Sequence, residues 1–242
     1  MNIVVANWKM NGDIFLAEQF VGRLNEIEDV CEIIICPPAA LLWSFRNFKY
    51  YLGAQNCFYE ESGAFTGENS PRLLKELGCD YVLLGHSERR ALFHESDEVI
   101  YRKWNAAVAQ SLRPIVCIGE KLDERSNWKE VLSRQLKNYI DRRDLNDTIF
   151  AYEPVWSIGT GLTPSEEHLA EVIIFLKGIL PTSSLLYGGS VSSRNIGGIM
   201  SIDGVTGVLV GGSSLKIEEF ENIIRQMSEN SQIYIIHYEV SH

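Results

Sequence analysis

The sequence predicts an α/β protein folded as a single closed (β/α)8 barrel, and three observations support this prediction. Short apolar runs rich in β-branched residues recur about 30 residues apart, which is the length of one βα unit. Most of these runs are continuously apolar, as expected for parallel strands that are buried on both faces. Helix-like segments separate the runs, and no linker or low-complexity tract divides the chain. A doubly wound open sheet is the main alternative, because it also alternates strands with helices.

Eight runs are expected to form the strands of the barrel. In chain order they are Ile3–Ala6, Glu32–Cys36, Tyr51–Gln55, Tyr81–Leu84, Pro114–Ile118, Thr148–Tyr152, Ser184–Tyr187 and Gly207–Val210. The first expected helix begins after Asp13, whose side chain is a suitable N-cap. Its apolar face is expected to consist of Phe15, Leu16, Phe20 and Leu24.

Two later helix starts carry a serine followed by acidic residues, at Ser96 and at Ser165. Negative charge is stabilised at the beginning of a helix, so both positions favour a helix start. The helix after Ser165 is expected to bury Leu169, Val172, Ile173 and Leu176. A last helix is expected at about residues 217–227.

The chain is expected to form one barrel domain over residues 1–227, followed by a tail over residues 228–242. The tail does not continue the alternation, although residues 232–240 have a strand-like pattern. Such a segment could dock on the barrel or pair with another chain, as exposed edge strands do. A loosely docked extension without a function is the simpler interpretation, and the sequence assigns the tail no role.

Composition restricts the partners and the compartment. The net charge of −10 argues against a nucleic-acid partner, because binding to a phosphate backbone needs a basic face. The five cysteines contain no C-x-x-C pair, which predicts buried thiols rather than a disulfide framework or a zinc site. The first residues lack the basic region of a signal peptide, and the densest apolar stretch is too short to cross a bilayer. We therefore expect a cytoplasmic protein that does not bind membranes.

Glycine pairs follow the seventh and eighth expected strands, at Gly188-Gly189 and at Gly211-Gly212. Glycine lets backbone N–H groups approach an oxyanion closely, and the following helix starts add positive dipole ends. The loops after strands seven and eight are the usual phosphate position in barrels of this kind. A lone glycine pair is more often a turn, but two pairs at equivalent positions predict a phosphate site.

Three ionisable residues follow expected strands at the same end of the barrel: Lys9, His86 and Glu153. Glu153 ends a hydrophobic strand and loses solvation there, which suits a general base, although a salt-bridged structural glutamate is the alternative. His86 could donate a hydrogen bond to a developing oxyanion, although a lone histidine is more often structural. Lys9 offers a fixed cation for an anionic substrate. Glu88 is a candidate partner for that lysine or a member of a surface ion pair.

The connection over residues 154–164 is expected to be a lid. It is rich in glycine, yet Trp156 and Ile158 are apolar and need something to cover. A loop that closes over a ligand would explain both features and would exclude water from a reactive intermediate. A static, packed loop is the alternative.

In several longer motifs the chain resembles the triosephosphate isomerase family, and this resemblance makes the expectations above more specific. The motifs are Asn7-Trp8-Lys9-Met10-Asn11-Gly12, Gly85-His86-Ser87-Glu88-Arg89-Arg90, Ala151-Tyr152-Glu153-Pro154-Val155-Trp156, Ile158-Gly159-Thr160-Gly161, Tyr187-Gly188-Gly189-Ser190-Val191 and Leu209-Val210-Gly211-Gly212. They occur in the order of the family, from Ile3 to about Met227. The resemblance implies a TIM barrel that interconverts dihydroxyacetone phosphate and glyceraldehyde 3-phosphate without a cofactor or a metal, a step of glycolysis and gluconeogenesis.

The resemblance also implies roles for single residues. Glu153 matches the base that moves a proton between two carbons, His86 matches a neutral electrophile, and Lys9 matches the cation that stabilises the intermediate. This family is itself a well-known example of that pairing and of lid closure, so these roles rest on the resemblance. The matches for substrate binding are Asn7, Lys9, Gly159, Ser190, Gly211 and Gly212, and the supporting matches are Glu88, Cys117 and Thr66.

The segment Gly63–Glu68 resembles the loop by which each subunit of the family reaches its neighbour, with Thr66 near the neighbour's active site. The resemblance therefore implies a homodimer. Two departures from the family concern the hinge of the lid, where Leu162 and Pro164 stand. A third is His94, where the family usually has glycine, and the sequence assigns it no function.

Two other functions compete with the isomerase. A Schiff-base aldolase on a phosphate-binding barrel would need a lysine at an inner strand end in the later units, but the sixth strand leads into Glu153. A catalytically inactive homologue that acts as a binding protein would be expected to have lost Lys9, His86 or Glu153. All three are present, so the isomerase is the main interpretation.

Overall fold

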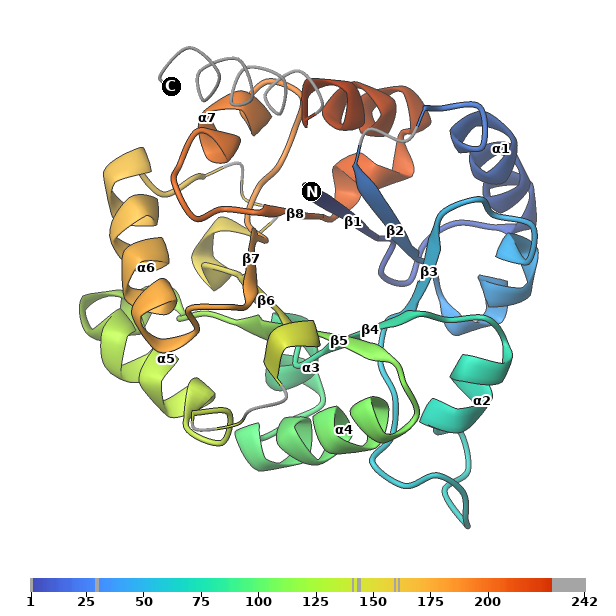
Figure 1. Cartoon of the computed structure of the whole chain (residues 1–242), viewed down its shortest axis with the longest axis horizontal. Helices are drawn as coiled ribbons and strands as arrows, with labels where there is room; N and C mark the ends of the chain where they lie inside the picture. The colour runs from blue at the N-terminus through green and yellow to red at the C-terminus, as the bar shows by residue number, and fades with distance from the viewer. Residues whose placement is uncertain are drawn as a thin grey trace, which may run out of the picture.

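A computed structural model describes residues 2–28, 31–140, 142, 145–158, 160 and 162–227 of the chain. Eight parallel strands follow one another around a closed barrel, and β1 pairs with β8 to close it (Figure 1). The strands are β1 (Ile3–Asn7), β2 (Glu32–Cys36), β3 (Tyr51–Ala54), β4 (Tyr81–Leu84), β5 (Arg113–Ile118), β6 (Ile149–Tyr152), β7 (Ser184–Tyr187) and β8 (Gly207–Val210). This confirms the predicted barrel and rules out the open sheet, in which β1 and β8 would not pair.

Helices surround the barrel on its outside (Figure 1). They are α1 (Ile14–Leu24), α2 (Pro71–Glu76), α3 (Ser87–Leu92), α4 (Asp97–Ala109), α5 (Trp128–Leu136), α6 (Glu166–Ile179) and α7 (Ile196–Met200). A further helical segment covers residues 217–227. The connection after β2 differs from the simple alternation, because it contains a 3₁₀ helix, Ala39–Phe45, in place of an α-helix. The connection between β4 and β5 contains two helices, α3 and α4.

The three predicted helix starts are confirmed, and each has a side chain that caps the helix. The Asp13 carboxylate accepts the N–H of Leu16 at 2.8 Å at the start of α1. Ser96 and Ser165 accept backbone N–H groups in the same way at the starts of α4 and α6. Each cap satisfies one of the N–H groups that a helix end leaves without a partner.

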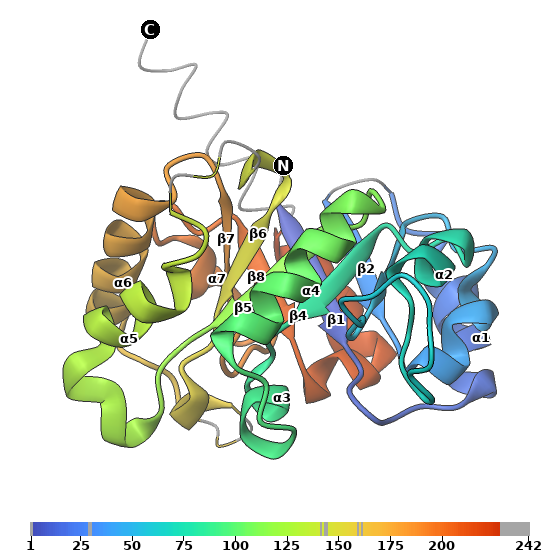
Figure 2. The same ribbon diagram turned by 90° about the horizontal axis from the view of Figure 1, so that it is seen from below.

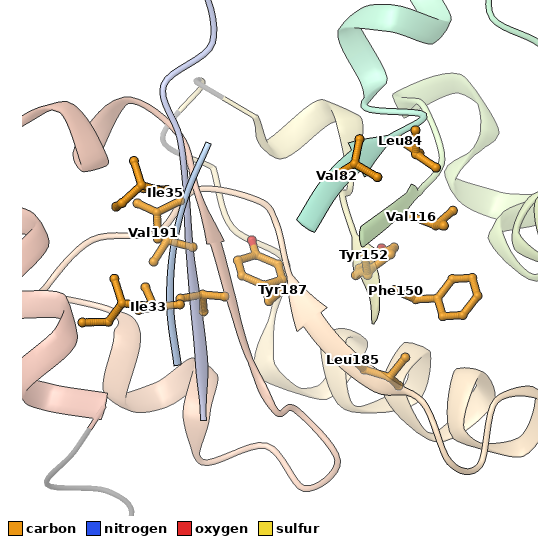
Figure 3. Packing of buried hydrophobic residues seen from close by; sticks show 14 of the residues in the cluster. Ile33, Ile35, Val82, Leu84, Val116, Phe150, Tyr152, Leu185, Tyr187 and Val191 are labelled. Carbon is orange, nitrogen blue, oxygen red and sulfur yellow. The ribbon is translucent and has the colours of Figure 1, made fainter. Parts of the chain in front are cut away.

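Side chains alternate between two cores along each strand, because successive residues of a strand point to opposite faces. One cluster fills the inside of the barrel and comprises Ile3, Val5, Ile34, Cys36, Tyr81, Leu83, Ile115, Cys117, Ile149, Ala151, Leu186 and Leu209. The larger cluster lies between the strands and the surrounding helices. Figure 3 shows part of it, including Ile33, Ile35 and Val82.

One prediction about α1 is wrong. Phe15 was expected on the buried face, but its side chain is 67% exposed. Phe20 and Leu24 are fully buried, and Leu16 lies one turn before them on the same face. A helix turns by about 100° per residue, so Phe15 points away from this row. The predicted face of α6 is confirmed, since Leu169, Val172, Ile173 and Leu176 are all buried.

All five cysteines are buried and none forms a disulfide, in agreement with the sequence.

His94 has a φ of 55°, a left-handed conformation in which glycine is favoured. A glycine would adopt this conformation without strain. None of the helices in the described part of the chain is long and apolar enough to cross a membrane. The predicted tail, residues 228–242, lies outside the described residues, so the division of the chain at residue 227 stays a prediction.

Candidate active site

A cavity of about 360 Å³ opens at the carboxyl ends of the strands. This is the end of the barrel at which α3 lies, opposite the N-terminus (Figure 2). Seven of the residues predicted for the site line this cavity: Asn7, Lys9, His86, Glu153, Ser190, Gly211 and Gly212. They come from the ends of β1, β4, β6, β7 and β8, so the closed barrel brings together residues that are far apart in the sequence. Gly159 falls outside the described residues.

Glu153 follows β6 directly and its side chain is buried, with 2% of the residue exposed. The N–H of Ser87 donates to Glu153 Oε2 at 3.2 Å, and His86 Nε2 lies 3.1 Å from Glu153 Oε1. Gly188 makes room for this carboxylate, because a Cβ there would come within 2.9 Å of Glu153 Cγ. A buried carboxylate with few donors keeps lone pairs available for a proton, which suits a general base.

His86 is the N-cap of α3, where its Nδ1 accepts the N–H of Glu88 at 3.3 Å. A nitrogen that accepts a hydrogen bond carries no proton, so the proton of the neutral ring lies on Nε2, facing Glu153. Burial lowers the pKa of His86, but the charge and hydrogen bond of Glu153, with Glu88 adding to them, raise it above the ordinary value overall. The same carboxylate that would act as base therefore controls the charge of this imidazole.

Lys9 has a left-handed backbone with a φ of 53°, a conformation that costs a non-glycine residue about 1–3 kcal/mol. Asn7 Oδ1 accepts the Lys9 N–H at 3.0 Å, and Gln55 Nε2 donates to the Lys9 carbonyl at 2.8 Å. These contacts hold the strained turn in place. Lys9 Nζ lies 2.6 Å from Glu88 Oε1, so the predicted pairing of these residues is present in the structure.

The two glycine pairs line the same cavity from adjacent strands. Side chains would not fit at Gly188 or Gly189, because a Cβ at either position would overlap Glu153 or Tyr187. These two glycines therefore leave room for side chains of the protein, whereas a Cβ at Gly211 or Gly212 would meet no atom closer than 3.5 Å. Ser190 stands next to the first pair, and its Oγ donates to the carbonyl of Ser157 at 2.7 Å.

The base of the predicted lid is anchored by a residue for which the sequence alone proposed no role. Glu120 is fully buried, and its Oε1 accepts hydrogen bonds from Trp156 Nε1 at 2.9 Å and from the Tyr152 hydroxyl at 3.1 Å. The Glu120 carbonyl also accepts the N–H of Val155. Ile158 lies further along the segment and lines the cavity. The apolar lid residues thus have separate tasks, since Trp156 anchors the loop and Ile158 faces the ligand space.

The three supporting residues lie in different places. Glu88 pairs with Lys9 at the border of the cavity. Cys117 is buried inside the barrel, where burial and the charge of Glu153 raise the pKa of its thiol. Thr66 is exposed and lies away from the cavity in this chain. No role was expected from the sequence for Gln55, which holds the turn at Lys9, or for Glu120, which anchors Trp156.

Gly119 is expected to be intolerant of any side chain. A Cβ there would overlap the backbone carbonyl of Glu153, and neither backbone can move without disturbing β5 and β6. Gly119→Ala is therefore expected to lower the free energy of unfolding by about 3 kcal/mol or more, a cost typical of severe overpacking. Urea unfolding measures this change.

The matched control is Gly22→Ala in α1, where an added Cβ meets nothing within 4 Å. It is expected to raise the free energy of unfolding by about 0.5–1 kcal/mol, because alanine favours a helix over glycine. Equal stabilities for the two variants would contradict the close approach at Gly119.

Comparison with known proteins agrees with this geometry. The sequence model of the family described as Triosephosphate isomerase matches residues 2–227. A triosephosphate isomerase of Dehalococcoides mccartyi (strain BAV1) is 44% identical over 243 residues, covering 93% of this chain and 95% of the relative. The corresponding protein of the Wolbachia of Brugia malayi is 42% identical, covering 94% and 98%, and that of Clostridium tetani is 39% identical, covering 92% and 95%. Because the family match spans nearly the whole barrel and several relatives exceed a third identity, this chain belongs to the triosephosphate isomerase family.

Proposed function

We propose that Glu153, His86 and Lys9 carry out the isomerisation that defines this family, the interconversion of dihydroxyacetone phosphate and D-glyceraldehyde 3-phosphate. The Glu153 carboxylate removes a proton from one carbon and returns it to the neighbouring carbon. The Nε2–H of His86 donates a hydrogen bond to the carbonyl oxygen and moves a proton between the two oxygens of the enediolate. The Lys9 ammonium stabilises the negative charge that develops on them.

The observation that carries this proposal is the meeting of His86 and Glu153 beside the glycine loops. His86 Nε2 lies 3.1 Å from Glu153 Oε1 in a cavity that is also lined by Ser190, Gly211 and Gly212. A phosphate held by backbone N–H groups of these loops would place the adjoining carbons of a triose in the same cavity. Gly159 is proposed as a further phosphate ligand on the strength of the resemblance alone.

A coupled assay tests the proposed reaction. The purified full chain is expected to convert glyceraldehyde 3-phosphate to dihydroxyacetone phosphate in buffer containing EDTA, with no cofactor added. An acid–base isomerisation needs only the groups described above. Absence of turnover by the correctly folded chain would contradict the activity, and turnover that depends on added metal would contradict the mechanism.

We also propose that the chain forms a homodimer through the loop Gly63–Glu68. This loop projects outward from the barrel in Figure 1, and Phe65 within it packs against Phe58. A second cavity, of about 520 Å³, lies beside the catalytic one and shares Asn7, Lys9 and His86 with it. Exposed apolar side chains border that cavity, among them Met10 at 93% and Leu92 at 70% exposure. The same loop of a second copy, with Thr66 near its tip, would cover them.

Analytical ultracentrifugation tests the dimer with two variants that place a charge on an exposed apolar residue. Met10→Asp is expected to sediment as a monomer, because it buries an unpaired carboxylate in the proposed interface. Ile174→Asp is the control, since Ile174 is 71% exposed on α6, away from the second cavity, and should stay dimeric. A monomeric wild type, or a dimeric Met10→Asp, would contradict this interface.

We propose the cytoplasm as the site of action. All five cysteines are free and buried, a pattern typical of reducing compartments. Fractionation of the producing cells, with activity in the cytosolic fraction as the readout, tests this.

A further inference from the structure

The catalytic cavity contains a second cation that neither the sequence motifs nor the family match assigns to the reaction. Apart from His86, its lining within the described residues includes two basic residues, Lys9 and Arg194, and Arg194 also borders a neighbouring pocket beside α6. Lys9 is engaged with Glu88 at 2.6 Å. Arg194 is exposed, and within the described part of the chain its guanidinium forms no ion pair or hydrogen bond. A residue that is exposed and also lines the cavity can reach both solvent and the mouth of the cavity with its side chain.

The backbone that carries Arg194 is held firmly, although its side chain is free. Asn195 Oδ1 accepts the N–H of Ser192 at 2.8 Å, and Asn195 Nδ2 donates to the carbonyl of Ser190 at 2.9 Å. Glu219 accepts both the N–H and the hydroxyl of Ser193, at 2.7 and 3.0 Å. This turn therefore connects Arg194 rigidly to Ser190 in the predicted phosphate loop, and the nearby Glu219 carboxylate is already occupied.

The negative charge of the protein is a reason for a cation near the phosphate of the substrate. The chain carries a net charge of −10, and the cavity also contains the Glu153 carboxylate, whereas the proposed substrate is a phosphate dianion. Neutral N–H groups of the glycine loops bind phosphate oxygens but add no full charge. A guanidinium matches the geometry of phosphate oxygens and can bind two of them at once. At the mouth of the cavity it would also attract the dianion against the overall negative field.

We infer that Arg194 is a substrate-binding residue that contacts the phosphate group from the mouth of the cavity and favours phosphorylated over unphosphorylated trioses. It takes no part in proton transfer, so it changes substrate affinity rather than the chemical step. This inference rests on the proposed isomerisation and adds a specificity determinant to it.

Steady-state kinetics of Arg194→Gln test the inference, with Arg46→Gln as the matched control. Arg46 is also exposed but lies at the end of the 3₁₀ helix after β2, outside the cavity. At low ionic strength, Arg194→Gln is expected to raise KM for glyceraldehyde 3-phosphate about three- to tenfold, the range for an exposed charge-assisted contact. The kcat should stay within about twofold, and the effect on KM should shrink as salt screens the charge.

A second substrate separates binding of the phosphate from a structural effect. Isomerisation of unphosphorylated glyceraldehyde, followed by NMR, should proceed at the same kcat/KM in Arg194→Gln and in the wild type. Arg194→Lys should recover part of the lost affinity, because a lysine keeps the charge but not the paired donors. An unchanged KM in Arg194→Gln would overturn the inference, and so would an equal loss with both substrates. Failure of the proposed function is distinct from these outcomes, because it would appear as an inactive wild type.

Discussion

Glu153→Gln is expected to lower kcat by about 10²–10⁴-fold, the range for loss of a positioned general base. Glutamine keeps the size of the side chain and can still accept the N–H of Ser87, but its amide cannot take a proton from carbon. The Glu153 carboxylate is buried beside His86 Nε2. Among the described residues that line the cavity there is no other carboxylate that could replace it as the base. Coupled assays in both directions measure the loss.

Binding of inorganic phosphate should survive this substitution, because the glycine loops that would hold phosphate are separate from the carboxylate. Calorimetry is expected to give a Kd within about threefold of the wild-type value. Glu130→Gln is the matched control, since Glu130 is an exposed residue of α5 far from the cavity lining. A Glu153→Gln variant that binds phosphate poorly but retains a near-normal kcat would show that Glu153 positions the ligand and is not the base.

His86→Ala is expected to lower kcat by about 10²–10³-fold, the scale for removal of one donor to a developing oxyanion. The variant also loses the N-cap of α3, which costs about 1 kcal/mol of stability. Thermal unfolding shows whether this loss unfolds the protein, and kcat is compared only at temperatures where the variant is folded. A kcat within tenfold of wild type would contradict the role of His86 in the reaction.

The charge of His86 can be tested separately from its role. The folded-state pKa of His86 is raised above its ordinary value of 6.5 by Glu153 and Glu88, against the lowering effect of burial. In Glu153→Gln the main raising charge is gone, so NMR titration should show the pKa of His86 falling. Because the pKa of His86 is raised, the interaction of its protonated ring with Glu153 stabilises the fold fully below about pH 6.5. This stabilisation is lost as the pH rises through the folded-state pKa of His86.

The pH–activity profile follows from the same argument. The neutral ring donates from Nε2, so kcat should fall as the pH decreases through the pKa of His86. An activity that required the protonated imidazole would contradict the neutral tautomer indicated by the Glu88 N–H.

Local signals in the sequence were sufficient for much of the fold. Each expected strand agrees with the observed one to within one residue at either end, because a strand buried on both faces must be continuously apolar. The helix starts after Asp13, Ser96 and Ser165 could also be predicted, since the cap or the acidic residues that favour a helix start lie in the same short segment. The exposure of Phe15 could not be predicted, because Phe15 and Leu16 are both apolar and the sequence does not decide which of them faces the core.

The candidate site, too, could be predicted in part from the sequence. The residues that follow the strands could be named from the sequence, since in a closed parallel barrel all carboxyl ends meet at one face. The net charge of −10 argues against a nucleic-acid partner, yet it carries no information about a local anion site. Backbone N–H groups and single cations act over a few ångströms, whereas surface charges are screened over about 8–10 Å.

Contacts between distant segments are what only the tertiary structure decided. Gln55 holds the strained turn at Lys9 across 46 residues of sequence, and Glu120 anchors Trp156 across 36. Arg194 has an unremarkable sequence context, and the turn that carries it is held by the hydrogen bond that Asn195 donates to Ser190 and the one that Glu219 accepts from Ser193. Periodicity and capping depend on near neighbours and can be read along the chain. Hydrogen bonds between loops depend on where the closed barrel places each loop. The roles of Gln55, Glu120 and Arg194 could therefore be found only in the tertiary structure.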